Sequence, residues 1–137
     1  MQSILLDTCA VIWIAEGASL AEEGRSALEQ AASDGLPTFI SPITAWEVGQ
    51  LVAKKRLQLT ATPDRWFNAA LSRATVSLAP MPPSLLIASS FLPGRPPRDP
   101  ADRIVVATAR DLGATLITRD RVLLAYGKQG HVSVVEC

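Results

Sequence analysis

Histidine and cysteine are scarce in this sequence of 137 residues, which contains one histidine and two cysteines. A zinc site needs several such ligands close together, so His131, Cys9 and Cys137 do not predict one. The two cysteines also make no disulfide framework, and we therefore expect a chain that folds in a reducing cytosol.

An excess of charge of either sign is lacking as well, because 13 acidic residues balance 13 basic residues. No overall electrostatic field therefore favours a nucleic-acid partner, and such binding has to come from a local group of basic residues. The sequence contains no glycine-rich phosphate loop, internal repeat or low-complexity segment. Its apolar N-terminal segment has no basic region and is interrupted by Asp7, so we expect neither a signal peptide nor a membrane-spanning segment there.

Hydrophobic residues make up 48% of the sequence and charged residues 19%, which is typical of a globular protein with a real core. We expect one domain over residues 1–137. Short apolar segments predict strands at residues 3–6, 38–41, 75–80, 114–118 and 132–135. Helices are expected at residues 10–15, 20–32, 42–55, 63–74, 84–90, 100–113 and 121–126. This alternation predicts an α/β fold, with a parallel sheet of four to five strands and helices on both faces.

Two aspartates stand at the start of the helix expected after the proline-rich loop at residues 92–98. Asp99 before Pro100 is typical of an N-cap and a first-turn proline. Asp102 would then be the third helical residue, where the helix dipole favours an acid, yet it shares a face with Val105 and Val106. A charge on the buried side of a helix needs a partner from elsewhere in the chain.

Other acids fall where the strands of such a sheet end. Asp7 directly follows the first expected strand, and Asp120 follows the fourth by two residues. Glu47 lies on an apolar helical face after the second strand. Because function in parallel sheets collects beyond the carboxyl ends of the strands, these acids and Asp102 could converge. Gathered carboxylates repel one another, so either some stay protonated or a cation lies among them. Mg²⁺ or Mn²⁺, which prefer oxygen ligands, would suit such a site and support phosphodiester hydrolysis.

Three segments resemble those of one family: LLDTCAVIW near the N-terminus, SPITAWEVGQLVAKKRL in the middle, and DPADRIVVATA with ATLITRDRVLLAYG near the C-terminus. They are similar to PIN-domain proteins and, more narrowly, to the VapC toxins of toxin–antitoxin pairs. The resemblance spans essentially the whole chain, with its segments in the family's order.

This resemblance implies a Rossmann-like sheet and a Mg²⁺- or Mn²⁺-dependent endoribonuclease that acts on structured RNA such as tRNA or rRNA. It maps the acidic quartet of the family onto four residues of this chain, as catalytic and metal-binding residues: Asp7, Glu47, Asp102 and Asp120. It also implies inhibition by a co-encoded VapB-type antitoxin in the cytoplasm. We expect a homodimer, with apolar helical faces in the first half of the chain used for these contacts. Cys9 stands where many relatives have histidine, a difference that we expect to leave the metal site untouched.

Simpler structural roles remain open for several of these residues. Asp7 could only cap the next helix, and Asp120 could lie in an ordinary turn. Asp99 is assigned to the cap, with an outer-shell role as the alternative, and Thr118 could bind a metal water or merely end a strand. Four arginines close to the acids could line a path for RNA phosphates or serve as counter-charges: Arg98, Arg103, Arg119 and Arg121.

Two other functions compete with a ribonuclease. A non-catalytic PIN-like module would bind RNA or a protein partner, but such a module is expected to have lost some of the acids, and all four are in place. A phosphatase of the haloacid-dehalogenase type needs a second aspartate two residues after its nucleophile, and that position is Cys9.

Overall fold

The structure, a computed structural model, describes residues 2–137, in which five strands and seven helices are found. The strands are β1 (Ile4–Leu6), β2 (Thr38–Ile40), β3 (Val76–Leu78), β4 (Thr115–Thr118) and β5 (Val134–Glu136). The helices are α1 (Thr8–Ala15), α2 (Glu22–Ser33), α3 (Pro42–Ala53), α4 (Pro63–Leu71), α5 (Pro83–Ala88), α6 (Pro100–Leu112) and α7 (Arg121–Lys128). Every expected element is present within a few residues of its predicted place, and residues 92–98 form the expected loop. Over the described residues, no helix combines the length and the apolar composition needed to cross a membrane.

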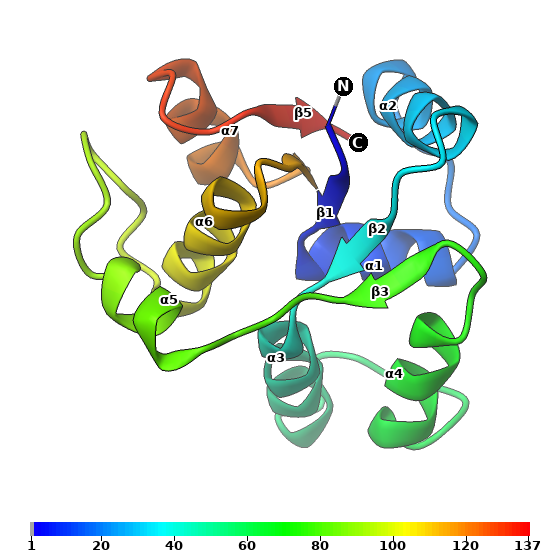
Figure 1. Ribbon diagram of the computed structural model, residues 1–137. Helices are drawn as coiled ribbons and strands as arrows, with labels where there is room; N and C mark the ends of the chain where they lie inside the picture. The colour runs from blue at the N-terminus through cyan, green and yellow to red at the C-terminus, as the bar shows by residue number, and fades with distance from the viewer. Residues whose placement is uncertain (1) are drawn as a thin grey trace.

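The strands form one parallel sheet in the order β3-β2-β1-β4-β5, with β1 in its middle (Figure 1). In the register of the sheet, Leu5 of β1 lies between Phe39 of β2 and Leu116 of β4. All three residues of β1 are buried, as expected for a parallel strand that is covered on both faces. The predicted α/β fold is thus confirmed, and its central strand leads directly into Asp7.

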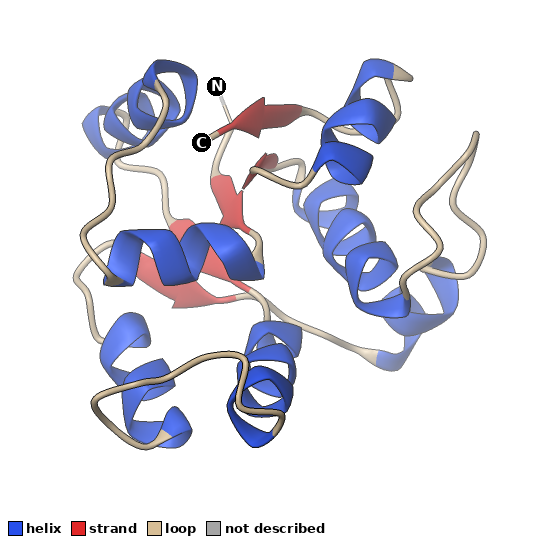
Figure 2. Cartoon of the chain, turned by 180° about the vertical axis from the view of Figure 1, so that it is seen from behind, coloured by secondary structure: helices blue, strands red, loops and turns tan. Residues whose placement is uncertain are grey.

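Alternate side chains of β1 point into two separate parts of the core. Leu5 belongs to a cluster with Val106 of α6 and Leu123 of α7. Leu6 packs on the opposite face of the sheet, in a cluster that includes Val11 of α1. In the view from behind, α1 crosses in front of the strands, on the face that Leu6 occupies (Figure 2). The alternation of side chains along a strand therefore fixes which helices cover each face.

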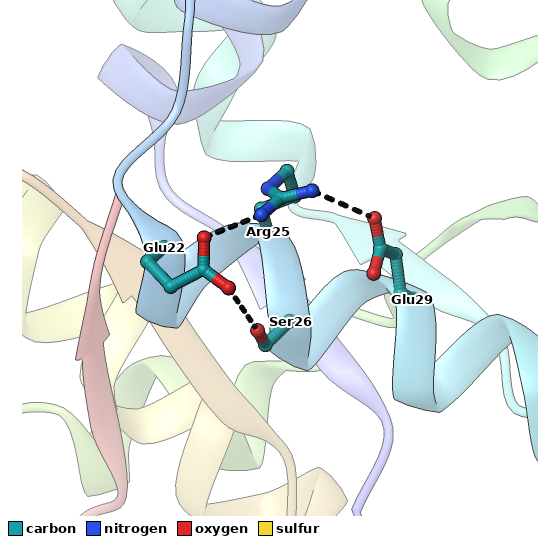
Figure 3. A network of polar contacts seen from close by, with 4 residues as sticks. All are labelled: Glu22, Arg25, Ser26 and Glu29. Carbon is teal, nitrogen blue, oxygen red and sulfur yellow. Dashed lines mark hydrogen bonds and ion pairs between the residues drawn. The ribbon is translucent and has the colours of Figure 1, made fainter.

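Helix α2 is held against the edge strand β5 by close packing rather than by its charges. A Cβ atom on Gly24 would stand 2.9 Å from the Cα atom of Cys137, so only glycine fits at this approach. On the exposed side of the same helix, Arg25 pairs with Glu22 and, at 3.5 Å, with Glu29 (Figure 3). Both pairs are exposed and screened by solvent, so they contribute little to stability.

Polar side chains cap the N-termini of four helices, α1, α3, α6 and α7. Ser41, after β2, accepts the backbone N–H of Ile43 at 3.1 Å and is followed by Pro42, the first residue of α3. Asp7, Asp99 and Asp120 cap α1, α6 and α7 in the same way. The local rules for starting a helix therefore bring acidic side chains to one edge of the sheet.

Candidate active site

The four acids of the predicted quartet line a single pocket at the carboxyl edge of the sheet. The pocket has a volume of about 190 Å³, and neither lysine nor arginine is among its lining residues. Its acids come from four distant segments: Asp7, Glu47, Asp102 and Asp120. The strands that follow β1 in sequence, β2 and β3, lie on one side of it, whereas β4 and β5 lie on the other side. Ligands of such sheets bind beyond the carboxyl ends of the strands at this reversal, which lies between β1 and β4. The structure thus brings together the residues that the sequence pattern selected.

Asp7 is almost fully buried, with 6% of its surface exposed. Its Oδ1 atom accepts the backbone N–H of Ala10 at 2.9 Å and so caps α1, while Oδ2 accepts the hydroxyl of Thr118. Burial raises the pKa of Asp7, although these hydrogen bonds lower it, and the negative charge of Asp120 raises it further. The capping role that the sequence left open for Asp7 is therefore real. It is compatible with a place in the pocket, which Asp7 lines, because a carboxylate oxygen can accept more than one bond.

A pair of threonines holds Glu47. The hydroxyl of Thr8 donates to Glu47 Oε1 at 2.5 Å, and the Oγ1 atoms of Thr8 and Thr44 lie 3.0 Å apart. Thr44 is completely buried in α3, one turn before Glu47. Burial raises the pKa of Glu47, as do the charges of Asp99 and Asp7, while the bond from Thr8 lowers it. Sequence reasoning missed both threonines, although a buried polar residue one turn before Glu47 was a usable signal.

Asp102 has the least compensation among the four acids. The predicted cap is confirmed, because Asp99 Oδ1 accepts the backbone N–H of Asp102 at 3.0 Å. Asp102 itself forms no ion pair among residues 2–137. Burial, followed by the charges of Asp99, Asp120, Glu47 and Asp7, raises its pKa to about 7. Asp102 lies beside Val105 and needs a positively charged partner, but no side chain within residues 2–137 provides one.

Thr118 connects two of the acids. Its hydroxyl donates to Asp7, and its oxygen accepts the backbone N–H of Asp120 at 2.9 Å. Asp120 in turn caps α7, with Oδ1 accepting the N–H groups of Val122 at 2.8 Å and Leu123 at 3.0 Å. Thr118, the last residue of β4, thus fixes the position of Asp7 relative to Asp120.

Cys9 lies in the pocket, contrary to the expectation that this position would leave the site untouched. Its thiol donates to Asp7 Oδ1 at 3.0 Å and to Oδ2 at 3.2 Å. Burial and the charge of Asp7 raise the pKa of the thiol to about 12, so it remains a protonated donor. The signal was present in the sequence, because a capping Asp7 places the second helical residue directly beside its own carboxylate.

The donor set of the pocket fits a divalent cation that prefers oxygen. Carboxylate and hydroxyl oxygens line it together with the thiol of Cys9, and burial, with the charges of neighbouring acids, raises the pKa values of three of the acids. No group of three or more acidic, cysteine or histidine side chains within residues 2–137 converges tightly enough to hold an ion by itself. Mg²⁺ usually takes only one or two carboxylates directly and keeps several waters, so it does not require such a group.

The arginines predicted near the acids separate into two groups. Arg98 is exposed at the end of the proline-rich loop, and Arg103 extends toward α5, where it donates to the carbonyl of Ser89 at 3.5 Å. Arg119 and Arg121 flank Asp120 in the sequence and line a separate groove beside the acidic pocket. None of the four forms an ion pair within the described chain, so none neutralises the acids as an ion-pair partner.

Acidification is expected to stabilise the protein when a chelator keeps divalent ions away from the pocket. The folded state holds the pKa of Asp102 at about 7, above its ordinary value of 3.8. The folded state therefore binds more protons than the unfolded chain between about pH 4 and pH 7, and stability falls as pH rises through that range. The raised pKa values of Asp7 and Glu47 act in the same direction.

We expect a gain of about 1–2 kcal/mol on going from about pH 7.5 to pH 5.5, after allowance for the partial exposure of Asp102. Thermal denaturation in chelator at the two pH values measures it as a rise in Tm. Asp102→Asn should remove most of the rise, and a Tm that falls on acidification would contradict the electrostatic picture.

Comparison with known proteins identifies the family of the chain, over a range that includes all four acids. Residues 4–129 match the PIN domain model. The chain is 32% identical over 136 residues to Ribonuclease VapC22 of Mycobacterium tuberculosis, which covers 98% of this chain and 99% of that protein. Its fold is similar to that of VapBC2 from Rickettsia felis bound to a promoter DNA fragment, with a TM-score of 0.68, 14% identity and 98% of each chain covered. VapBC-5 from Mycobacterium tuberculosis gives a TM-score of 0.58 at 18% identity, covering 99% of this chain and 98% of that one.

Proposed function

Because this chain belongs to the PIN-domain family, we propose that it is a Mg²⁺- or Mn²⁺-dependent endoribonuclease, working in the cytosol as the toxin of a toxin–antitoxin pair. The observation that carries the proposal is the pocket lined by four carboxylates from four segments with no cationic side chain among its lining residues. The name of the relative in Mycobacterium tuberculosis supports the ribonuclease activity, and its similarity extends over nearly the full length of both chains.

The proposed partners follow from the same comparisons. The solved structures with this fold include toxin–antitoxin complexes, so we assign a VapB-type antitoxin as the inhibitor of this chain. RNA of the tRNA or rRNA class is the proposed substrate. A second copy of the chain is the proposed companion in a homodimer.

Asp7, Glu47, Asp102 and Asp120 are proposed to hold the ion, directly or through water. A bound divalent ion supplies positive charge against the scissile phosphate, activation of the attacking water and stabilisation of the leaving oxygen. The chain supplies the orientation of the acids. Thr118 fixes Asp7 relative to Asp120, and Thr8 fixes Glu47. Asp102, whose pKa is raised by burial and by the charges of four other acids, gains most from a nearby positive charge.

The test is incubation of the purified chain with total cellular RNA in Mg²⁺, in Mn²⁺ and in chelator, followed by mapping of the new RNA ends. We expect discrete cuts that need the ion and leave 5′-phosphate and 3′-hydroxyl ends. No cuts by folded protein that is free of antitoxin would favour the non-catalytic module instead. A phosphate trapped on Asp7 would favour the phosphatase alternative, because a nuclease of this kind forms no phosphorylated aspartate.

A further inference from the structure

A second groove lies beside the acidic pocket, where α7 begins and β5 ends. Its volume is about 650 Å³, and three cationic side chains line it together with one acid, Glu136. The cations are Arg119, Arg121 and Lys128. We call this feature the basic groove. The basic groove lies at the carboxyl edge of the sheet, where the four carboxylates also gather.

The cations of the basic groove are not neutralised by the protein. Within residues 2–137 both ion pairs are made by Arg25 on α2, so neither Arg119, Arg121 nor Lys128 is paired with a carboxylate. With three cations against the single acid Glu136, the groove has an excess of positive charge, and a concave surface focuses such a potential and concentrates ions of the opposite sign. In a chain with no net charge, this groove is therefore a local site for an anion.

The location of Arg121 is difficult to explain by stability. It is the first residue of α7 and is exposed, so it contributes little packing. A cation in the first turn is opposed by the helix dipole, which favours acids there. Lys128 lies seven residues later, on the same face of the helix and about 10 Å along its axis. The two charges therefore border the groove along one helical face, with Leu124 and Ala125 between them.

Arg119 is held in place before any ligand arrives. Its guanidinium carbon lies 3.8 Å from the centre of the Trp13 ring, and a terminal nitrogen donates to the carbonyl of Ser19 at 3.0 Å. Its buried Nε atom has no hydrogen-bond partner in the described part of the chain. A guanidinium that is already positioned loses little side-chain entropy when it meets a phosphate.

The basic groove and the acidic pocket meet at Asp120. This residue lines the acidic pocket, and its two neighbours in sequence, Arg119 and Arg121, line the groove. We propose that the basic groove binds the phosphodiester backbone of the RNA on one side of the cleaved bond, a role that rests on the proposed ribonuclease function. A polyanion that places one phosphate among four carboxylates needs compensating cations nearby, and these are the unpaired cations that adjoin the pocket.

The test compares two double variants in an Asp102→Asn chain, which is used so that bound RNA is not cleaved. Arg121→Gln with Lys128→Gln removes two charges from the groove. Lys54→Gln with Lys55→Gln removes two exposed charges at the end of α3, outside the groove. Binding of fluorescein-labelled bulk tRNA is followed by anisotropy between about 50 and 200 mM salt.

We expect the groove variant to bind about tenfold more weakly, and the slope of log affinity against log salt to become shallower by about 1.4–1.8, which is two lost phosphate contacts. The control variant should keep the slope of its parent. In chains with Asp102 restored, the loss of cleavage should be found in KM rather than in kcat.

Equal slopes in the groove and control variants would overturn the proposal while leaving the ribonuclease intact, since the chain with Asp102 restored would still cleave RNA. A groove variant that keeps tRNA affinity but loses binding of poly-glutamate would also overturn it, and would assign the groove to an acidic polypeptide. If the Asp102→Asn parent does not bind RNA and the chain with Asp102 restored does not cleave it, the proposed function fails first, and the groove assignment fails with it.

Discussion

Replacement of Asp102 by asparagine is expected to slow RNA cleavage by about 10²- to 10³-fold, because it weakens the hold on the ion, and losing charge stabilisation in a transition state typically costs this much. Asparagine has the same shape but no charge, so the change tests the charge alone. The fold should tolerate it well, because burial and the neighbouring acids raise the pKa of Asp102 and so disfavour its charged form. Cleavage of total RNA and thermal denaturation of the same preparation measure both effects.

Asp111→Asn is the matched control, since Asp111 is exposed on the same helix and does not line the acidic pocket. It should leave cleavage at the parental rate. Parental cleavage by Asp102→Asn, at the same positions in the RNA, would mean that Asp102 is not part of the catalytic group. A large loss in both variants would instead point to the helix rather than to the pocket.

Thr118→Val is expected to reduce cleavage by about 10- to 100-fold and to raise the Mg²⁺ concentration that gives half of full activity, because partners that orient metal ligands usually matter by this amount. Valine keeps the shape of threonine but removes the hydroxyl that donates to Asp7 and accepts from the backbone of Asp120. Two acids then lose their fixed relative position. A Mg²⁺ titration of the cleavage rate measures the change.

Thr108→Val is the control for the loss of a buried hydroxyl. The side chain of Thr108 is also buried, but its hydroxyl donates to the carbonyl of Ile104 within α6 and contacts none of the four acids. Thr118→Ser should recover most of the lost activity, because the hydroxyl returns. Equal losses in Thr118→Val and Thr108→Val would show that the effect is structural, and an unchanged Mg²⁺ requirement would contradict the positioning role.

Features set by near neighbours in the chain were predictable from the sequence. Asp99 followed by Pro100 predicted the start of α6 correctly, because a cap and a first-turn proline act within three residues. Convergence of Asp7 with Asp120 also followed from a general rule, namely that parallel strands end at one edge of the sheet.

Contacts between distant side chains were not predictable in the same way. The bond from Thr8 to Glu47 joins residues 39 apart, and it depends on how α1 and α3 pack together. The strand order β3-β2-β1-β4-β5 had no local signal either. Lys128 was missed because a cation in the last turn of a helix also complements the helix dipole, and that structural role has the same sequence pattern as a ligand contact.

The central place of β1 also has a consequence during synthesis on the ribosome. The contact between Asp7 and Thr118 joins residues 111 positions apart, and at about 5–20 residues per second roughly 5 to 20 seconds separate their appearance. During that interval one edge of β1 has no partner, since β4 has not yet been made. Arrival of β4 closes that edge and adds Asp120 to the pocket in the same step. A partly made chain therefore lacks the complete set of acids until late in translation, which delays the nuclease relative to the growth of the chain that carries it.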